Sequence, residues 1–248
     1  RERDGKNVLH MEVGQPSVGP PTFVLDAAHA ALDQCARGET TLGYTVADGT
    51  DELRGKVAES YRTRYGVDVD PTHVMVTTGS SAAFVLAFLA AFDAGDRVAI
   101  AQPGYPCYRN ILEALGVEVV PVPVDATTNF QPTPGLLDLA EKENPTKPIK
   151  GVIVASPSNP TGTVLTSREL FALHDWFDTK PSGKAFFVSD EIYHQIEYGT
   201  ERAASALEAP AAKEAQVAIV INSFSKFHCL TGWRVGWCIV PDSLRNSM

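Results

Sequence analysis

The sequence predicts an α/β protein, a three-layer αβα sandwich in which helices cover both faces of a mostly parallel, seven-stranded sheet. Short β-branched runs recur along the chain, and several are continuously apolar, as in strands that are covered on both faces. Helix-like stretches lie between many of these runs, and such alternation favours a parallel sheet. One wide sheet favours one dominant domain. The expected strands are residues 74–77, 98–101, 117–122, 152–155, 186–189, 217–221 and 235–240.

The first part of the chain is predicted to hold an extended arm and then two helices. Residues 1–21 are rich in Gly and Pro, which favours irregular backbone. Residues 22–36 carry apolar side chains at helical spacing. Asp48 or Thr50 is a candidate N-cap for a second helix that runs through Val57.

Three further helices are expected between the strands. Residues 81–92 are apolar nearly all round, so we expect this helix to be buried. Residues 108–115 and 168–177 are amphipathic, which is typical of helices that cover a sheet with one face.

The composition indicates an ordinary globular chain. Of the 248 residues, 44% are hydrophobic and 21% are charged, which excludes a disordered, a collagen-like or a small disulfide-framework protein. With 21 basic and 30 acidic residues the formal net charge is −9, so a general nucleic-acid-binding surface is not expected. A local phosphate pocket stays open, because one or two well-placed cations suffice for it.

The cysteines and the apolar runs predict a cytoplasmic protein with neither a metal site nor a membrane span. No two of the four cysteines form a Cys-x-x-Cys pair, so we expect free thiols in a reducing compartment. The longest apolar run, residues 82–92, is too short to cross a bilayer, and no secretory signal peptide opens the chain. Because the chain starts without Met and stops just after a strand-like segment, we expect a fragment. The cysteines are Cys35, Cys107, Cys229 and Cys238.

Polar side chains gather where the expected strands end, which is where open α/β sheets bind ligands. Ser80 and Ser81 follow Gly79 at the start of the apolar helix, where free N–H groups and the helix dipole favour an anion. This pattern predicts a phosphate site. The alternative is that one of the two serines caps its own helix.

A lysine, Lys226, follows the strand at 217–221, with Ser223 before it and Arg234 after it. A desolvated lysine loses its proton more readily and becomes a nucleophile toward carbonyl groups. Arginine presents a planar fork to phosphate oxygens. The alternative is a surface lysine in a turn.

A carboxylate, Asp190, ends the strand at 186–189, and Tyr193 lies three residues later, while Asn159 follows the preceding strand. A carboxylate at this place is suited to a protonated ring nitrogen of a ligand. The alternatives are a helix cap for Asp190 and a plain turn around Asn159. Together with the lysine and the anion site, these residues make up the set that pyridoxal phosphate requires.

Several short motifs follow one another in the order and spacing of a known family. On these motifs the sequence resembles the fold-type I pyridoxal-phosphate enzymes, in particular the class I/II aminotransferases of the aspartate aminotransferase family. The resemblance runs over nearly the whole chain. The motifs are Gly14-Gln15-Pro16, Tyr44 with Gly49 and Leu53-Arg54, Pro103-Gly104-Tyr105-Pro106, Ser156-Pro157-Ser158-Asn159-Pro160-Thr161-Gly162, Ser189-Asp190-Glu191-Ile192-Tyr193, and Ser223-Phe224-Ser225-Lys226 with Gly232-Trp233-Arg234.

The resemblance implies a role for each of these site residues. Lys226 would hold pyridoxal 5'-phosphate as a Schiff base and then move the substrate proton. Asp190 would keep the pyridine nitrogen protonated. The remaining implied contacts are Tyr193 and Asn159 to the ring's phenolic oxygen, Ser80, Ser81, Ser223 and Arg234 to the phosphate, Tyr105 to the ring face, Tyr44 to the phosphate in a neighbouring subunit, and Gly14 and Asn159 to the substrate.

The resemblance also implies a homodimer, a division into domains and a pair of substrates, an amino acid and a 2-oxo acid. Residues 1–21 would be an arm that belongs to a small domain, and residues 22–248 would be the large pyridoxal-phosphate-binding domain. The carboxyl-terminal part of the small domain, with the arginine that binds the substrate carboxylate, would be missing from the chain.

Three other functions stay open. Ser223 and Lys226 fit the Ser-x-x-Lys pattern of penicillin-recognising enzymes, but no Lys-Thr-Gly is present and Glu191 follows Ser189-Asp190 where Ser-Asp-Asn is needed. A carbon–sulfur lyase shares the cofactor set and the same carbanion chemistry. A non-catalytic protein that binds pyridoxal phosphate is the third, because fold does not determine function.

Overall fold

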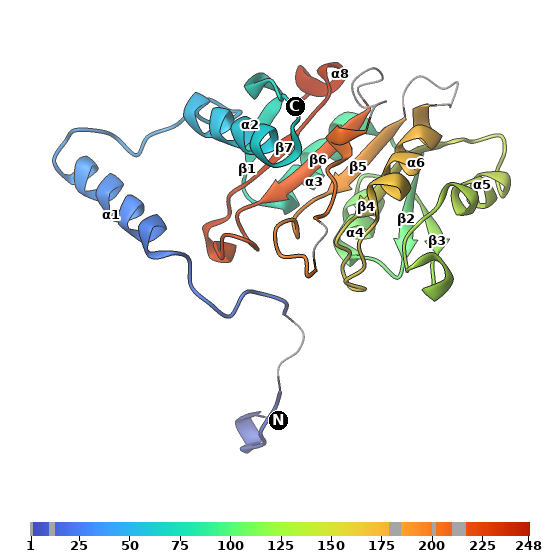
Figure 1. Cartoon of the computed structure of the whole chain (residues 1–248), viewed down its shortest axis with the longest axis horizontal. Coiled ribbons are helices and arrows are strands. Elements are labelled where there is room, and N and C mark those ends of the chain that lie inside the picture. Colours follow the sequence, from blue (N-terminus) through green and yellow to red (C-terminus); the bar gives the residue numbers. More distant parts are fainter. Residues whose placement is uncertain (1, 10–12, 179–184, 200–201, 210–216) are drawn as a thin grey trace.

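The sheet and its connections form the centre of the molecule (Figure 1). The computed structural model describes residues 2–9, 13–178, 185–199, 202–209 and 217–248. Within these residues seven strands form one sheet in the order β1-β7-β6-β5-β4-β2-β3. β7 is antiparallel to both of its neighbours, and the other pairs are parallel. The strands are β1 (Val74–Thr77), β2 (Arg97–Gln102), β3 (Glu118–Pro123), β4 (Ile149–Ala155), β5 (Phe186–Asp190), β6 (Ala218–Ser223) and β7 (Gly236–Ile239).

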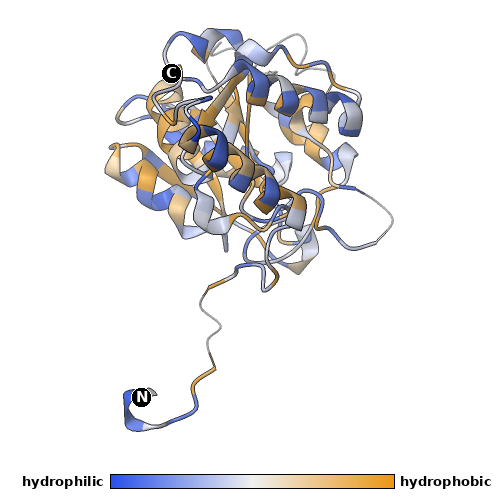
Figure 2. Ribbon diagram, turned by 90° about the vertical axis from the view of Figure 1, so that its left-hand side faces the viewer, coloured by the Kyte–Doolittle hydropathy of each residue, from blue (hydrophilic) through white to orange (hydrophobic). Residues whose placement is uncertain are grey.

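Helices cover both faces of this sheet, which confirms the predicted three-layer α/β architecture. α2, α5 and α6 pack on one face, and α3, α4 and the short α8 pack on the other. Figure 2 shows mostly hydrophobic strands at the centre, between helices that carry both hydrophobic and hydrophilic residues. The helices are α1 (Thr22–Ala36), α2 (Asp51–Tyr65), α3 (Ser80–Ala91), α4 (Pro106–Ala114), α5 (Pro134–Lys142), α6 (Ser167–Asp178) and α8 (Asp242–Arg245).

Each face of the sheet has its own core, and β4 contributes to both. Val152 and Val154 pack with α2, α5 and α6, whereas Ile153 packs with α3 and α4. Successive strand residues point to opposite faces, so a strand between two cores is apolar at most of its positions, as at residues 152–155 of β4. This is the physical reason for the continuous apolar runs in the sequence.

The second helix begins where one of the two candidate caps predicts it. The hydroxyl of Thr50 accepts a hydrogen bond from the backbone N–H of Leu53 at 3.3 Å, so Thr50 is the N-cap of α2. The carboxylate of Asp48 instead forms an ion pair with Arg54 at 2.5 Å. α2 ends at Tyr65 and is followed by Gly66, whose φ of 68° is the left-handed conformation that glycine adopts without strain.

The apolar helix α3 is less buried than the sequence predicts. Only its sheet-facing side is buried, and Val85, Leu86 and Leu89 are 38%, 39% and 57% exposed. The prediction of a helix buried nearly all round is therefore wrong for the chain as the structure describes it. The reason is that the sheet covers the helix from one side only, and a uniformly apolar sequence does not tell which side is covered.

The amino-terminal part lies apart from the sheet. α1 occupies its predicted residues, has no buried residue, and stands away from the body of the molecule in Figure 1. The expected arm at residues 1–21 precedes it, although residues 1 and 10–12 lie outside the described residues.

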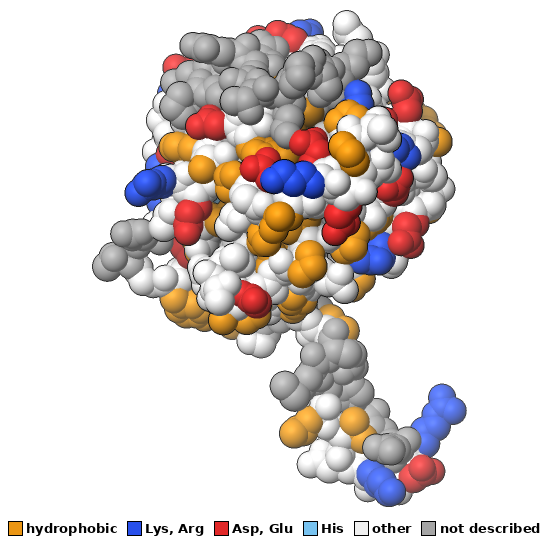
Figure 3. Space-filling view, turned by 90° about the vertical axis from the view of Figure 1, so that its right-hand side faces the viewer, with side chains coloured by type: hydrophobic (Ala, Val, Ile, Leu, Met, Phe, Trp, Pro, Cys, Tyr) orange, Lys and Arg blue, Asp and Glu red, His pale blue; other side chains and the backbone are white. Residues whose placement is uncertain are grey.

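The surface at the β3 edge of the sheet carries charges of both signs. Figure 3 shows acidic and basic side chains interspersed on this side of the molecule. Glu118 of β3 pairs here with Lys147 at 2.8 Å and with Arg97 at 3.0 Å. Among the described residues, no helix has both the length and the apolar character needed to cross a membrane.

Candidate active site

The candidate site lies where β4, β5 and β6 end and α3 begins. Asp190 is the last residue of β5 and pairs in register with Ala155 of β4 and Ile221 of β6. Gly236 of β7 lies between Thr77, the end of β1, and Ser223, the end of β6. The sheet thus brings together strand ends that are far apart in sequence, as the rule for parallel sheets predicts.

An anion-binding cradle forms around the start of α3. Gly79 precedes the helix with a φ of 79°, and no side chain caps the helix, which excludes the interpretation of Ser80 or Ser81 as an N-cap. The first N–H groups of α3 therefore have no capping partner and favour an anion. A Cβ added to Gly79 would lie 2.8 Å from Cζ of Arg234, so the guanidinium group lies directly against this glycine.

Ser223 completes the cradle from the neighbouring strand. A Cβ on Gly236 would lie 2.8 Å from the Ser80 nitrogen and 2.9 Å from the Asn222 oxygen, so α3 begins in close contact with the end of β6. The Ser223 side chain is 2% exposed, and its hydroxyl accepts a hydrogen bond from the N–H of Ser225 at 3.1 Å. One arginine and a helix start meet here, which is chemistry that suits a phosphate.

Asp190 is a buried carboxylate at the floor of the site. One of its oxygens accepts a hydrogen bond from the hydroxyl of Tyr108, and the other accepts one from the N–H of Ile192 at 3.1 Å. Burial raises the pKa of Asp190 to about 6, and the hydrogen bond from Tyr108 opposes that shift. Residues 192–195 form a turn rather than a helix, so Asp190 does not cap a helix.

Lys226 lies beside Tyr193 and the amino-terminal arm. Its Nζ donates a hydrogen bond to the carbonyl oxygen of Gly14 at 2.6 Å and lies 5.7 Å from the centroid of the Tyr193 ring. Burial lowers the pKa of Lys226, and the nearby charge of Asp190 opposes this. Asn159 donates a hydrogen bond to the Tyr193 hydroxyl at 3.3 Å. Lys226 is thus partly desolvated rather than a freely solvated surface lysine.

Two tyrosines at the start of α4 form one wall of the site. Tyr105 precedes the helix, and its ring meets that of Tyr108 edge-on with centroids 5.4 Å apart. The sequence predicts Tyr105 as a site residue but does not identify Tyr108. The available signal is a tyrosine on the buried face of an amphipathic helix, because a buried hydroxyl requires a partner. Sequence spacing does not reveal that the partner is Asp190.

Within the described residues, Tyr44 is the one predicted site residue that does not lie near the other site residues. Its side chain is fully exposed, and it lies in the segment between α1 and α2. The other predicted residues gather at the strand ends or, like Gly14, contact a residue that lies there.

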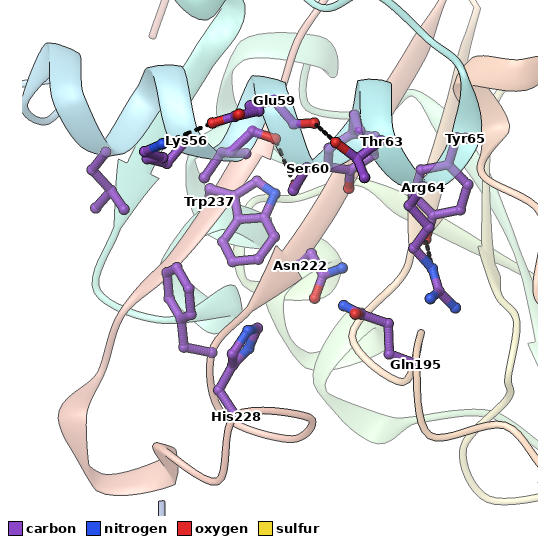
Figure 4. A pocket seen from close by; sticks show the side chains of 14 residues that line it. Lys56, Glu59, Ser60, Thr63, Arg64, Tyr65, Gln195, Asn222, His228 and Trp237 are labelled. Atoms are coloured by element: carbon purple, nitrogen blue, oxygen red, sulfur yellow. Dashed lines mark hydrogen bonds and ion pairs between the residues drawn. The ribbon is translucent and has the colours of Figure 1, made fainter. Parts of the chain in front are cut away.

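A cavity of about 670 Å³ lies on the other face of β6, beneath α2 (Figure 4). Asn222, Gln195 and His228 line it. Because residues alternate along a strand, Asn222 faces this cavity while the adjacent Ser223 faces the α3 side. The cavity is therefore separate from the anion-binding cradle.

Comparisons with known proteins agree on one family. The family model described as aminotransferase class I and II matches residues 6–248. A valine–pyruvate aminotransferase of Mycobacterium tuberculosis is 47% identical over 249 residues, which cover 100% of this chain and 60% of the relative. An aspartate aminotransferase of Geobacillus stearothermophilus is 33% identical, with coverage of 98% and 59%. The crystal structure of an aminotransferase from Mycobacterium tuberculosis superimposes with a TM-score of 0.82 at 49% identity, covering 95% of this chain and 60% of that one. That of the aspartate aminotransferase from Rhizobium meliloti gives 0.88 at 29% identity, with coverage of 99% and 58%.

Proposed function

Because the chain belongs to the class I and II aminotransferase family, we propose that it binds pyridoxal 5'-phosphate and serves a transamination between an amino acid and a 2-oxo acid. The observation that carries the proposal is the meeting of Lys226, Asp190 and the anion-binding cradle at one edge of the sheet. The chain spans about 60% of the length of the relatives it matches, so the activity proposed is that of the whole protein.

The residues present fit this cofactor. The uncapped start of α3 and Arg234 suit its phosphate, and the buried carboxylate of Asp190 suits its pyridine nitrogen. When bound, pyridoxal phosphate supplies an aldehyde that reacts with amines and a ring that withdraws electrons.

Lys226 and Asp190 perform the proton chemistry in this proposal. The lowered pKa of Lys226 increases the fraction of neutral amine, which is the form that attacks an aldehyde and later accepts or returns the substrate proton at Nζ. Asp190 holds a proton on the ring nitrogen through its negative charge.

The other predicted residues bind and orient the ring in this proposal. Tyr193 and Asn159, which share a hydrogen bond, bind the phenolic oxygen, and Tyr105 stacks on the ring face. The phosphate is held by Ser80, Ser81, Ser223 and Arg234, with Tyr44 from a second subunit. Gly14 and Asn159 contact the substrate. This role for Gly14 is supported by the hydrogen bond that its carbonyl oxygen accepts from Lys226.

We further propose a cytoplasmic homodimer in which residues 22–248 form the large cofactor-binding domain and residues 1–21 an arm of a small domain. Four free cysteines favour a reducing compartment. Valine and pyruvate are the first substrates to test, because the relative named for them is 47% identical and the aspartate aminotransferase quoted above is 33% identical.

The test is to reduce the purified chain with borohydride after adding pyridoxal phosphate and to locate the pyridoxyl group by peptide mass spectrometry. We expect it on Lys226. Lys226→Ala should remove both the label and the visible absorbance band. Labelling confined to another lysine, or no labelling of the folded chain, would refute the proposal.

A further inference from the structure

His194 is a buried histidine that the proposed function does not use. It follows Tyr193 directly, is 2% exposed, and contacts two segments far from it in sequence. Its Nε2 lies 2.9 Å from the carbonyl oxygen of Ser156, and its Nδ1 lies 2.5 Å from the hydroxyl oxygen of Tyr65. It therefore bridges the loop after β4 to helix α2.

The partners of His194 determine how its proton is placed. A carbonyl oxygen only accepts hydrogen bonds, so Nε2 must carry a proton and donate it to Ser156. Nδ1 shares a hydrogen bond with the hydroxyl of Tyr65, and a carboxylate oxygen of Glu191 lies 3.6 Å from the same nitrogen. Since Nε of Arg64 in turn donates to the Tyr65 oxygen at 3.1 Å, the bonds form one chain from α2 to the loop.

The α2 end of this chain is held firmly. The guanidinium of Arg202 lies over the Tyr65 ring, 4.9 Å from its centroid, and the Tyr61 ring packs at 5.3 Å. Arg64 also forms an ion pair with Glu197 at 2.7 Å. Figure 4 shows Arg64 and Tyr65 on the same turn of α2. The bond from His194 therefore fixes the Ser156 loop against a rigid helix.

The bond between His194 and Ser156 joins the two segments that carry the residues proposed to bind the ring oxygen. Asn159 is three residues after Ser156, and Tyr193 immediately precedes His194. The hydrogen bond between Asn159 and Tyr193 spans two separate loops at 3.3 Å. The distance between those loops is set on the other side by the bond from His194 to Ser156.

We propose that His194 is a positioning residue that holds the Asn159 loop and Tyr193 at the separation needed for both to donate hydrogen bonds to the ring oxygen of the cofactor. The inference rests on the proposed function. A purely structural histidine would contribute to stability and leave the cofactor's own properties unchanged.

The measurable consequence is the pKa of the nitrogen that joins Lys226 to the cofactor. Hydrogen bonds donated to the ring oxygen stabilise its negative charge, which is greatest when that nitrogen has lost its proton. Weakening these bonds must therefore raise the pKa of the nitrogen. The visible absorbance of the loaded protein reports this pKa in a pH titration, without any turnover.

We expect His194→Phe, which keeps a planar ring but removes both bonds, to raise the absorbance midpoint by about half a pH unit or more. His194→Gln, which keeps a donor for the Ser156 oxygen, should restore most of the wild-type midpoint. His174→Phe is the matched control, since His174 is a fully buried histidine of α6 that packs against Phe187 of β5. It should leave the midpoint unchanged.

An unchanged midpoint in His194→Phe, or an equal shift in His174→Phe, would overturn the inference. If His194→Phe does not fold, Tyr65→Phe removes the anchoring hydroxyl alone and must shift the midpoint in the same direction. The proposed function fails separately, when the wild-type chain forms no absorbance band that Lys226→Ala removes.

Discussion

The hydroxyl of Tyr108 donates a hydrogen bond to the carboxylate of Asp190, and both side chains are buried between the sheet and α4. The second carboxylate oxygen accepts from the N–H of Ile192. Burial favours the neutral acid, whereas these two donors favour the charged form. The hydrogen bond from Tyr108 therefore favours the charged form of Asp190 against the effect of burial.

Replacing Tyr108 by Phe should raise the pKa of Asp190 further above about 6, because a donor that lowers it is lost. A larger fraction of the carboxyl would then be neutral at pH 7. We expect the affinity for pyridoxal phosphate to fall roughly tenfold at pH 7 and to recover as the pH rises. Equilibrium dialysis between pH 6 and pH 9 measures this dependence.

Tyr61→Phe is the matched control for that change. The hydroxyl of Tyr61 is also buried, but it donates a hydrogen bond to Glu191 at 3.1 Å and not to Asp190. The control should keep the wild-type pH dependence. A Tyr108→Phe variant with the same pH dependence as wild type would show that Tyr108 does not govern the charge of Asp190.

Asp190→Asn should stabilise the chain without cofactor at alkaline pH. The folded-state pKa of about 6 exceeds the reference value of 3.8, so the protonated carboxyl favours folding. That contribution is complete below pH 3.8 and is lost as the pH rises through about 6. Above this range the buried charge costs about 3 kcal/mol, and an amide avoids the cost.

Thermal unfolding at pH 4 and pH 8 tests this sign. The variant should unfold at a higher temperature than wild type at pH 8, and the difference should shrink toward pH 4.

The same substitution should permit cofactor binding but abolish nearly all transamination by the whole protein, because an amide has no charge to hold a proton on the ring nitrogen. Wild-type turnover in this variant would contradict the role of Asp190.

Gly79→Ala should weaken both the fold and phosphate binding. The added methyl would displace the guanidinium of Arg234, whose Cζ lies 2.8 Å from the Cβ position. It also strains a residue whose φ of 79° and ψ of 171° lie in a region that essentially only glycine adopts. We expect a loss of about 1–3 kcal/mol in stability and of at least about tenfold in cofactor affinity.

Gly66→Ala is the control for a loss of stability away from the site. Gly66 has a φ of 68° and a ψ of 21°, the left-handed region that other residues tolerate better, and an added Cβ has no neighbour within 4 Å. Its substitution should cost about 1 kcal/mol of stability and leave cofactor affinity unchanged. Equal losses of affinity in both variants would mean that Gly79 acts through the stability of the fold alone.

Sequence patterns predicted the carboxyl ends of the strands to within two residues, because several strands are continuous apolar runs with polar residues at their ends. Asp190, Ser223 and Lys226 are therefore assigned to one edge by the sequence alone. The bond from Tyr108 to Asp190 joins residues that are 82 positions apart, and the one from Tyr65 to His194 spans 129 positions. No local periodicity encodes such pairs, so tertiary packing alone reveals them.

Tyr44 is the remaining predicted site residue, and its exposure in the single chain is consistent with a role in a neighbouring subunit. It lies between α1, which buries no residue, and the capped start of α2, where Asp48 is held by Arg54 at 2.5 Å. A fully exposed tyrosine next to an anchored loop end is a suitable interface anchor. We therefore predict that Tyr44 serves the cofactor of the partner subunit in a homodimer of the whole protein.

Subunit mixing tests this prediction directly. Lys226→Ala and Tyr44→Ala chains are each expected to be inactive or badly impaired as homodimers. If the site is shared, one of the two sites in a mixed dimer takes its lysine and its tyrosine from unmutated positions, so activity should partly return after subunit exchange. Mass spectrometry of the intact dimers verifies the exchange.

A mixture of Lys226→Ala with Asp190→Asn chains is the control. Lys226 and Asp190 of one chain serve the same site, so each site of this mixed dimer lacks one of the two residues and activity should not return. Recovery in the first mixture alone supports the prediction, whereas no recovery despite proven exchange would mean that Tyr44 acts within its own subunit.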